Sequence, residues 1–267
     1  MNIFRYKADI IPISIFIAFF LCDILAYFFI ADITWLLIYA GVTLIPRWFI
    51  CPWNHHHQHS MTFSYSIFNR IIEIMYGFQT GIVWFAWVLH HNLWHHLNYL
   101  DQTKDESAWK SPTGKRYNSI IYTWIISITA YPRAWKVGNK YPQMQMYFLL
   151  MCLIQLSLLI TLIVYNPLAW VLIFLIPMIT GIIITAYTTY HHHSGLEGSD
   201  HYSASYNLLD SWYNFLTGNL GYHTAHHIKG GLHWSELPRF HSQIESMIGK
   251  QFYKHNHFFY YSASENI

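Results

Sequence analysis

Four long apolar runs constrain the fold of this chain more than any other feature. They occupy residues 10–30, 34–50, 146–165 and 168–190, and their only acidic or basic residues are Asp23 and Arg47. A bilayer core about 30 Å thick is crossed by about 20 helical residues, so each run predicts a transmembrane helix. Only 10% of the 267 residues are charged, against about 25% in an ordinary soluble domain, which favours contact with lipid.

The links between these runs predict two helical hairpins. Residues 31–33 and 166–167 are short enough to return each helix directly, so both hairpin tips are expected on one side of the membrane. All fifteen lysines and arginines then lie on the other side, which the positive-inside rule assigns to the cytoplasm. We read residues 1–30 as an uncleaved helix, because no small-residue cleavage site follows the apolar run.

The predicted architecture is therefore an all-α, multi-pass integral membrane protein with one domain over residues 1–267. Its four helices carry a cytosolic helical cap built from residues 51–145 and 191–267, and both termini lie in the cytoplasm. A bacterial inner membrane is the expected location. Within the cap, residues 65–93 predict two amphipathic or half-buried helices, and residues 99–118 predict a polar loop near the mouth of a site.

Charge and cysteine content exclude several classes of function. The net charge is +2 and no basic run is present, so nucleic acid is not an expected partner. Cys22, Cys51 and Cys152 show no C-x-x-C spacing, which excludes iron–sulfur and rubredoxin-type sites within this chain. Asp23 is unusual because an ionisable group inside a membrane helix is costly and functional by default, although a position near a polar interface also explains it.

Histidine is the outlier in the composition, with 19 residues gathered mostly in four clusters. On a helix, residues at i and i+4 lie about 6 Å apart on one face, so His55 and His59 are expected to share an ion. In the second cluster, the same spacing puts His91 and His95 on one face and His96 on the next. The remaining clusters are His191-His192-His193, at the end of the fourth apolar run, and His223-Thr224-Ala225-His226-His227.

The number of clustered histidines favours two metal ions. Imidazole binds iron, zinc, copper and nickel, but eight or nine imidazoles exceed what one zinc ion needs and leave open positions for oxygen. Iron is favoured because oxygen activation beside a membrane substrate needs a redox metal. The scattered His201, His233, His241, His255 and His257 are expected to be interfacial residues.

Two other readings of the histidines are weaker. A transporter for zinc or iron would need ionisable groups at depth, and the four apolar runs offer only Asp23 there and no histidine at mid-membrane. A zinc membrane hydrolase is disfavoured because the H-E-x-x-H motif is absent.

Three of the clusters resemble the histidine boxes of the membrane fatty-acid desaturase and hydroxylase superfamily. They read HHHQH at 55–59, HNLWHH at 91–96 and HTAHH at 223–227. The gaps in the first two boxes are similar to those of bacterial membrane alkane hydroxylases, whose E-H-x-G-L segment resembles residues 192–196 here, with His192 in place of Glu. The resemblance implies a di-iron centre with these ligands: His55, His59, His91, His95, His96, His193, His223, His226 and His227. His56, His57, His191 and His192 stay open as replacements.

The resemblance also implies an activity. A fatty acyl or hydrocarbon chain would lie in a tunnel between the helices, and O2 would take two electrons from a donor and two from the substrate. Desaturation of a fatty acyl chain is the first choice; the alternatives are a terminal or alkyl-chain hydroxylase, which is a monooxygenase, and a decarboxylating oxidase that forms a terminal alkene.

Electrons must come from a separate protein such as a ferredoxin, a rubredoxin or cytochrome b5 with its reductase. A basic patch of Lys136, Lys140, Lys229 and Lys250 is a hypothetical docking surface for it. Acidic residues near the clusters are candidates to orient the metal-bound imidazoles: Asp101, Asp105, Glu106, Glu197, Asp200 and Asp210.

Overall fold

The computed structural model describes residues 2–254, whose regular secondary structure is helical, with isolated β-bridges but no strand. The elements, in chain order, are α1 Ile10–Phe29, α2 Ile33–Trp48, α3 Ile50–His59, α4 Ser66–Thr80, π-helix η2 Val88–His95, α5 His96–Asn98, α6 Ser119–Gly138, α7 Pro142–Tyr165, α8 Pro167–Trp170, π-helix η3 Val171–Leu175, α9 Ile176–His193, α10 Ser211–Thr217, α11 His223–Ile228 and α12 Leu237–Ile244. Short 3-10 turns occupy Lys7–Asp9, Trp234–Glu236, Glu245–Met247 and Lys250–Phe252.

Three helical stretches are long and apolar enough to cross a bilayer: Lys7–Phe29, Pro142–Tyr165 and Pro167–His193. A fourth span forms if α2 and α3 count as one, since they are bent by 40° at their junction. These stretches cover the four predicted runs, and the apolar helices fit a multi-pass membrane protein. The bend places the first histidine cluster on a helix of its own, α3, instead of directly after the second span.

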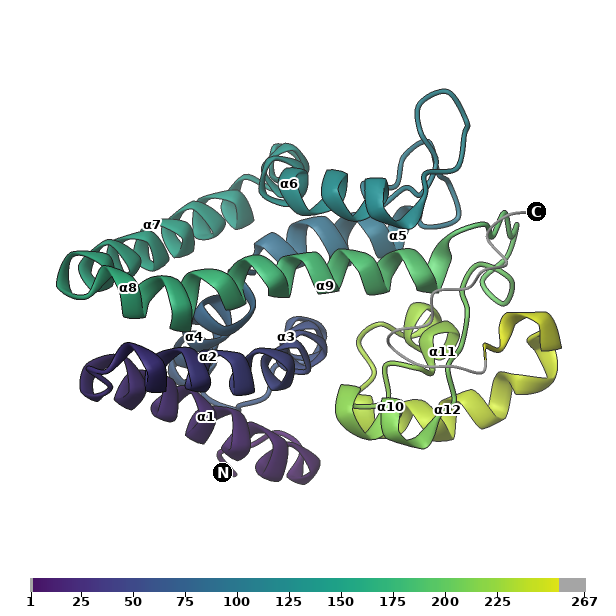
Figure 1. The fold of residues 1–267 in the computed structure, drawn as a ribbon. Coiled ribbons are helices and arrows are strands. Elements are labelled where there is room, and N and C mark those ends of the chain that lie inside the picture. Colours follow the sequence, from purple (N-terminus) through teal and green to yellow (C-terminus); the bar gives the residue numbers. More distant parts are fainter. Residues whose placement is uncertain (1, 255–267) are drawn as a thin grey trace.

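The ends of the two hairpins lie against each other. The hydroxyl of Tyr27, near the end of α1, donates to the carbonyl of Leu162 near the end of α7 at 2.5 Å. The rings of Phe28 and Tyr165 also meet edge to face at 5.5 Å. The turns after α1 and after α7 therefore lie at one end of the molecule (Figure 1).

Asp23 forms a buried ion pair with Arg47, and this explains its presence inside a membrane helix. Arg47 lies in the last turn of α2, its Nη2 donates to Asp23, and both side chains are almost fully buried. The hydroxyl of Tyr39 also donates to Asp23, at 2.7 Å. The expectation that Asp23 is functional by default is therefore replaced by a structural account, in which the carboxylate joins α1 to α2.

Helix α6 is the element that the sequence analysis missed. It spans Ser119–Gly138 and packs along α9, as Figure 1 shows. Its uncharged run, residues 119–131, ends at Pro132 and Arg133 and is shorter than the about 20 residues that cross a bilayer, so it does not qualify as a membrane span. Asn118 caps its start by accepting a hydrogen bond from the backbone N–H of Ile121 at 2.8 Å.

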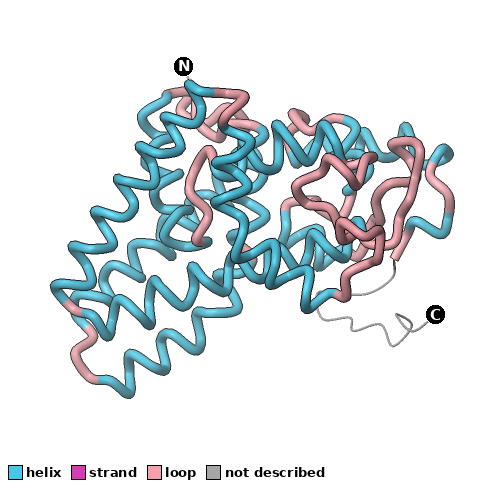
Figure 2. Tube along the Cα trace, turned by 90° about the horizontal axis from the view of Figure 1, so that it is seen from above, coloured by secondary structure: helices cyan, strands magenta, loops and turns pink. Residues whose placement is uncertain are grey.

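The long helices gather at one end of the molecule and the loops and short helices at the other (Figure 2). The predicted polar loop at 99–118 has no helix and is closed by a bridge between Lys110 and Arg116. Helices α4 and α9 cross closely, because Gly181 lies directly against the backbone carbonyl of Thr80. This crossing brings the ends of α3 and α9 beside η2, where the histidine clusters lie.

Candidate metal centre

His55 and His59 lie one turn apart on α3, as their spacing predicts. Their rings are 4.7 Å apart, centroid to centroid, and both contact the ring of His226 at 4.6 Å. The helix that carries them is buried along most of its length. One face of α3 therefore presents two imidazoles to the same space.

The second cluster folds differently from its predicted arrangement. Residues Val88–His95 form a π-helix, in which the hydrogen bonds run from i to i+5 and each turn takes more residues than in an α-helix. His91 therefore pairs with His96, their Nε2 atoms being 3.1 Å apart, while His95 turns to a different group of histidines. The prediction that His91 and His95 act from one face is wrong, because it assumed α-helical geometry.

The remaining candidate ligands come from the end of α9 and from α11. His193 is the last residue of α9, and the short helix α11 carries His223, His226 and His227. The three histidines of α11 point in two directions. His226 lies with the α3 histidines, whereas the Nε2 atoms of His223 and His227 lie 3.1 Å from each other.

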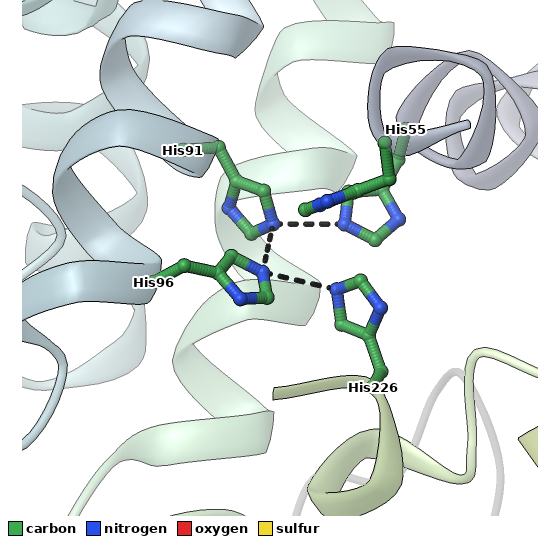
Figure 3. Close-up of side chains that lie close together, drawn as sticks. His55, His91, His96 and His226 are labelled. Carbon is green, nitrogen blue, oxygen red and sulfur yellow. Dashed lines mark hydrogen bonds between the residues drawn. The ribbon is translucent and has the colours of Figure 1, made fainter. Parts of the chain in front are cut away.

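The histidines form two groups whose ring nitrogens converge. The first group contains five residues with ligand atoms within 4.8 Å of one another: His55, His59, His91, His96 and His226. Figure 3 shows four of these rings turned toward one another, with Nε2 to Nε2 distances of 2.8 Å for His55 and His91 and 3.1 Å for His96 and His226.

The second group is built around His193. Its Nε2 lies 3.3 Å from that of His95, 3.0 Å from that of His223 and 3.1 Å from that of His227. His95, His193 and His227 meet the same 4.8 Å criterion as the first group, and all three are buried. The nine candidates from the sequence are therefore brought together, divided into five and four.

Burial keeps five of these imidazoles neutral. It lowers the pKa values of His91, His96, His223, His226 and His227 well below the usual 6.5, and neighbouring histidines lower them further. A neutral imidazole offers the lone pair that a metal ion needs. The Nε2 of His59 is also buried with no hydrogen-bond partner among the described residues. Such a set of converging neutral nitrogens fits two metal ions and is costly without them.

Asp105 is the one predicted acid that contacts a candidate ligand within residues 2–254. Its carboxylate accepts a hydrogen bond from Nδ1 of His95 at 2.8 Å, and both side chains are buried. This bond fixes the ring so that Nε2 faces the second group. His193 is fixed in the same way, because its Nδ1 lies 3.1 Å from the carbonyl of Ala204.

The other predicted acids make different contacts. Asp101 pairs with Lys104, Glu106 with Arg133 and Lys136, and Glu197 with Lys110. Asp200 accepts from the backbone of Tyr202, and Asp210 caps α10. None of these five touches a candidate ligand in the described chain, and sequence proximity alone had no means of separating them from Asp105.

The histidines left open as replacements lie outside both groups. Nε2 of His56 bonds the carbonyl of Thr217 at 3.0 Å, and His57 is held between Thr62 and Glu73. His192 lies between the carbonyl of Tyr206 and the hydroxyl of Tyr213. His191 contacts the ring of Tyr187 instead.

Tyr99 is a residue of the site that the sequence analysis missed. Its ring packs on that of His227 at 4.2 Å, and its hydroxyl lies 2.6 Å from Nδ1 of the exposed His201. His201 is thus a partner of the site and not an isolated interfacial residue. The available signal was the position of Tyr99 three residues after His96, one turn along a helix.

Two cavities lead away from the histidines. The proximal cavity, of ≈ 40 Å³, is lined by His55, His91, His95, His193 and His223, together with Trp87 and residues of α9. The distal cavity, of ≈ 70 Å³, lies beyond it between η2, α6 and α9, and shares Trp87, His91, Thr185 and Thr189 with the proximal cavity. Both histidine groups therefore border the proximal cavity, and the mainly apolar distal cavity lies next to it.

Comparison with known proteins places this arrangement in a family. No curated protein and no solved structure matches the chain significantly. The sequence from residue 33 to residue 259 does match the fatty acid desaturase family, and this range includes every histidine of both groups. The chain therefore belongs to the fatty acid desaturase family.

Proposed function

We propose that this protein is an oxygen-dependent enzyme that desaturates a fatty acyl chain with two non-haem iron ions. Family membership supports an oxidoreductase acting on a lipid-like substrate. The observation that carries the finer proposal is the convergence of nine histidines in two adjoining groups, and members of both groups border one cavity. We assign one iron to each group, with His55, His59, His91, His96 and His226 at one and His95, His193, His223 and His227 at the other.

The protein would contribute binding, orientation and exclusion of water. Two iron ions held there would supply the redox chemistry that couples O2 to the oxidation of a carbon–hydrogen bond. Asp105 orients His95, and Ala204 orients His193, so that the ring nitrogens face the second ion. The apolar wall around Trp87 would position the chain beside His91 and keep water from the reacting carbons.

The electrons would come from a separate protein. The three cysteines Cys22, Cys51 and Cys152 form no disulfide and are fewer than the four thiolates that usually hold an iron–sulfur cluster. We propose a ferredoxin, a rubredoxin or cytochrome b5 with its reductase. Of the four lysines suggested for docking, Lys136 and Lys140 lie by the end of α6, whereas Lys229 follows α11 and Lys250 follows α12.

We also propose the membrane arrangement in which both termini and the metal centre lie on the cytoplasmic side, within one domain over residues 1–267 and in a bacterial inner membrane. The contact between Tyr27 and Leu162 supports it, because it keeps the two hairpin tips together at one end. The histidine groups border the other end of α9.

The test is to purify the protein in detergent, count its metals and supply oxygen, a reducing system and a panel of acyl chains. Two irons per chain and a product two mass units lighter are expected. A gain of sixteen mass units would indicate a hydroxylase, and loss of carbon dioxide would indicate a decarboxylating oxidase. One zinc per chain with no oxygen uptake would contradict the proposal.

A paired substitution tests the ligand assignment. His193→Gln is expected to lose about one of the two irons, because the His193 ring lies at the centre of the second group. His192→Gln, its neighbour on α9, is expected to retain both, because that ring is held by Tyr206 and Tyr213. Equal iron loss in the two variants would contradict the assignment.

A further inference from the structure

The wall of the distal cavity is mostly apolar, as a site for a hydrocarbon chain should be. Most of its apolar residues come from α6, α9 and the segment before η2: Ile82, Ala86, Trp87, Ile126, Ala130 and Ile182. The cavity is connected to the metal centre through His91, which lines both cavities. A hydrocarbon alone would need nothing further from this wall.

The same wall contains polar atoms whose hydrogen bonds are not made. The Nε2 atom of His90 and the hydroxyl of Ser127 are buried and have no hydrogen-bond partner within residues 2–254. The hydroxyl of Thr185 is buried in the same way, and the Cys51 thiol beside it is a weak partner. A buried donor that stays unpaired has lost its hydrogen bonds to water without replacing them, which destabilises the fold.

Other polar side chains of this wall, in contrast, have hydrogen-bond partners within the protein. The hydroxyl of Tyr131 donates to the carbonyl of Gly81 at 2.7 Å and accepts from the backbone of Val83. The hydroxyl of Thr189 donates to the carbonyl of Thr185 at 2.9 Å. The missing hydrogen bonds are therefore confined to some of the polar groups of this wall and are not a property of all of them.

The three residues that carry these unpaired groups line the cavity from three different elements. His90 belongs to η2, Ser127 to α6 and Thr185 to α9. An imidazole N–H and two hydroxyls can all donate hydrogen bonds, so the matching ligand is a compact group rich in acceptors. A carboxyl group has two oxygens and about four lone-pair sites, whereas an alcohol or a thioester carbonyl offers one oxygen.

We propose that the distal cavity binds the carboxyl group of a fatty acid, with His90, Ser127 and Thr185 as its hydrogen-bond donors. The substrate is then a free acid, and the carbons nearest its carboxyl group lie closest to His91 and the metal centre. A volume of ≈ 70 Å³ admits a carboxyl group with a few methylenes, since one water needs about 10–15 Å³ on this measure. The inference rests on the proposed function, whose substrate it names.

The test is equilibrium binding to the full-length, iron-loaded protein in detergent. A radiolabelled fatty acid and the alkane of equal carbon number are each dialysed against the protein and against matched micelles. The unmodified protein is expected to bind the acid at least tenfold more tightly than the alkane. Ser127→Ala and Thr185→Val are each expected to weaken binding of the acid about 2- to 12-fold, the effect of one hydrogen bond, and to leave the alkane unchanged.

Two controls keep the result interpretable. Thr189→Val changes a hydroxyl in the same wall that already has a partner, so the preference for the acid should persist. Thr185→Ser restores a hydroxyl and should restore binding of the acid. Iron content, measured for every variant, identifies any variant that has lost its fold.

Either of two outcomes would overturn the inference: equal binding of acid and alkane by the unmodified protein, or variants that weaken both ligands alike. These outcomes are separate from failure of the proposed function. If the protein prefers the acid but takes up no oxygen with any chain, the proposed oxidation fails while the carboxyl-binding site stands. If the protein desaturates chains but binds acid and alkane equally, the carboxyl-binding site fails while the proposed function stands.

Discussion

At the scale of single residues, Asp105 acts on the metal centre without facing it. Its carboxylate accepts from Nδ1 of His95, so it fixes both the tautomer and the direction of that ring. His55, His223 and His227 have no such partner in the described chain, since their Nδ1 atoms are buried and unpaired. The second group therefore depends on Asp105 and the backbone carbonyl of Ala204 for its orientation.

Asp105→Asn tests this dependence. An amide can present its NH2 group to His95 and no longer demands the same tautomer, so the affinity for one of the two ions is expected to fall about 10- to 100-fold. The measurement is iron retained per chain during titration with a chelator. Asp101→Asn is the control, because Asp101 pairs with the exposed Lys104. Full retention of both irons by Asp105→Asn would contradict the orienting role.

At the scale of elements, the crossing of α4 and α9 depends on Gly181. A Cβ at this position would lie 2.5 Å from the carbonyl oxygen of Thr80, which is backbone and unable to move aside cheaply. Gly181→Ala is therefore expected to lower stability by about 1–3 kcal/mol through overpacking. Thermal unfolding in detergent measures it. Gly41→Ala on α2 is the matched control, since nothing lies within 4 Å of its added Cβ.

The pairing of α1 with α2 depends on a buried charge pair. Arg47→Met leaves the Asp23 carboxylate buried without its cation, which is expected to cost about 3–5 kcal/mol. Replacing both residues, as in D23L/R47M, removes the unpaired charge and should recover most of this loss. Thermal unfolding of the unmodified protein and the two variants in one detergent measures these changes in stability. If the single and double variants unfold alike, the pair does not join the helices.

The sequence and the structure diverge most at η2 and α6. Spacing alone selected histidines of the second cluster that converge with other histidines in the structure, but it paired them wrongly, since nothing in Val88–His95 predicts a π-helix. Helix α6 was missed because its uncharged run ends at Pro132 and is shorter than the about 20 residues of a membrane span. Both elements line the distal cavity, so the sequence did not predict the space beside the metal centre.

At the scale of the whole molecule, the buried histidines make stability depend on pH. The folded-state pKa values of His91, His96, His223, His226 and His227 lie below the usual 6.5, because burial disfavours the charged ring. Below about pH 6.5 the unfolded chain binds more protons than the folded chain, so stability falls as the pH falls. Above that pH these groups are neutral in both states and contribute no slope.

The expected result is a lower thermal unfolding midpoint for the metal-free protein at pH 5.5 than at pH 7.5. The interval from pH 7.5 to pH 8.5 serves as the control, because these histidines do not titrate there in either state. A midpoint that stays constant from pH 7.5 to pH 5.5 would show that the folded histidines hold protons as readily as the unfolded ones.

The sequence by itself determined the class of this protein and the residues available to its site. Apolar runs of bilayer length predict membrane helices wherever they occur, and histidine spacing selects candidate ligands without knowledge of the fold. Only the tertiary structure shows how those histidines divide into two groups, that Asp105 is the acid that orients His95, and where the cavity lies. These depend on contacts between α3, η2, α6, α9 and α11, which are far apart along the chain and meet only when the helices pack.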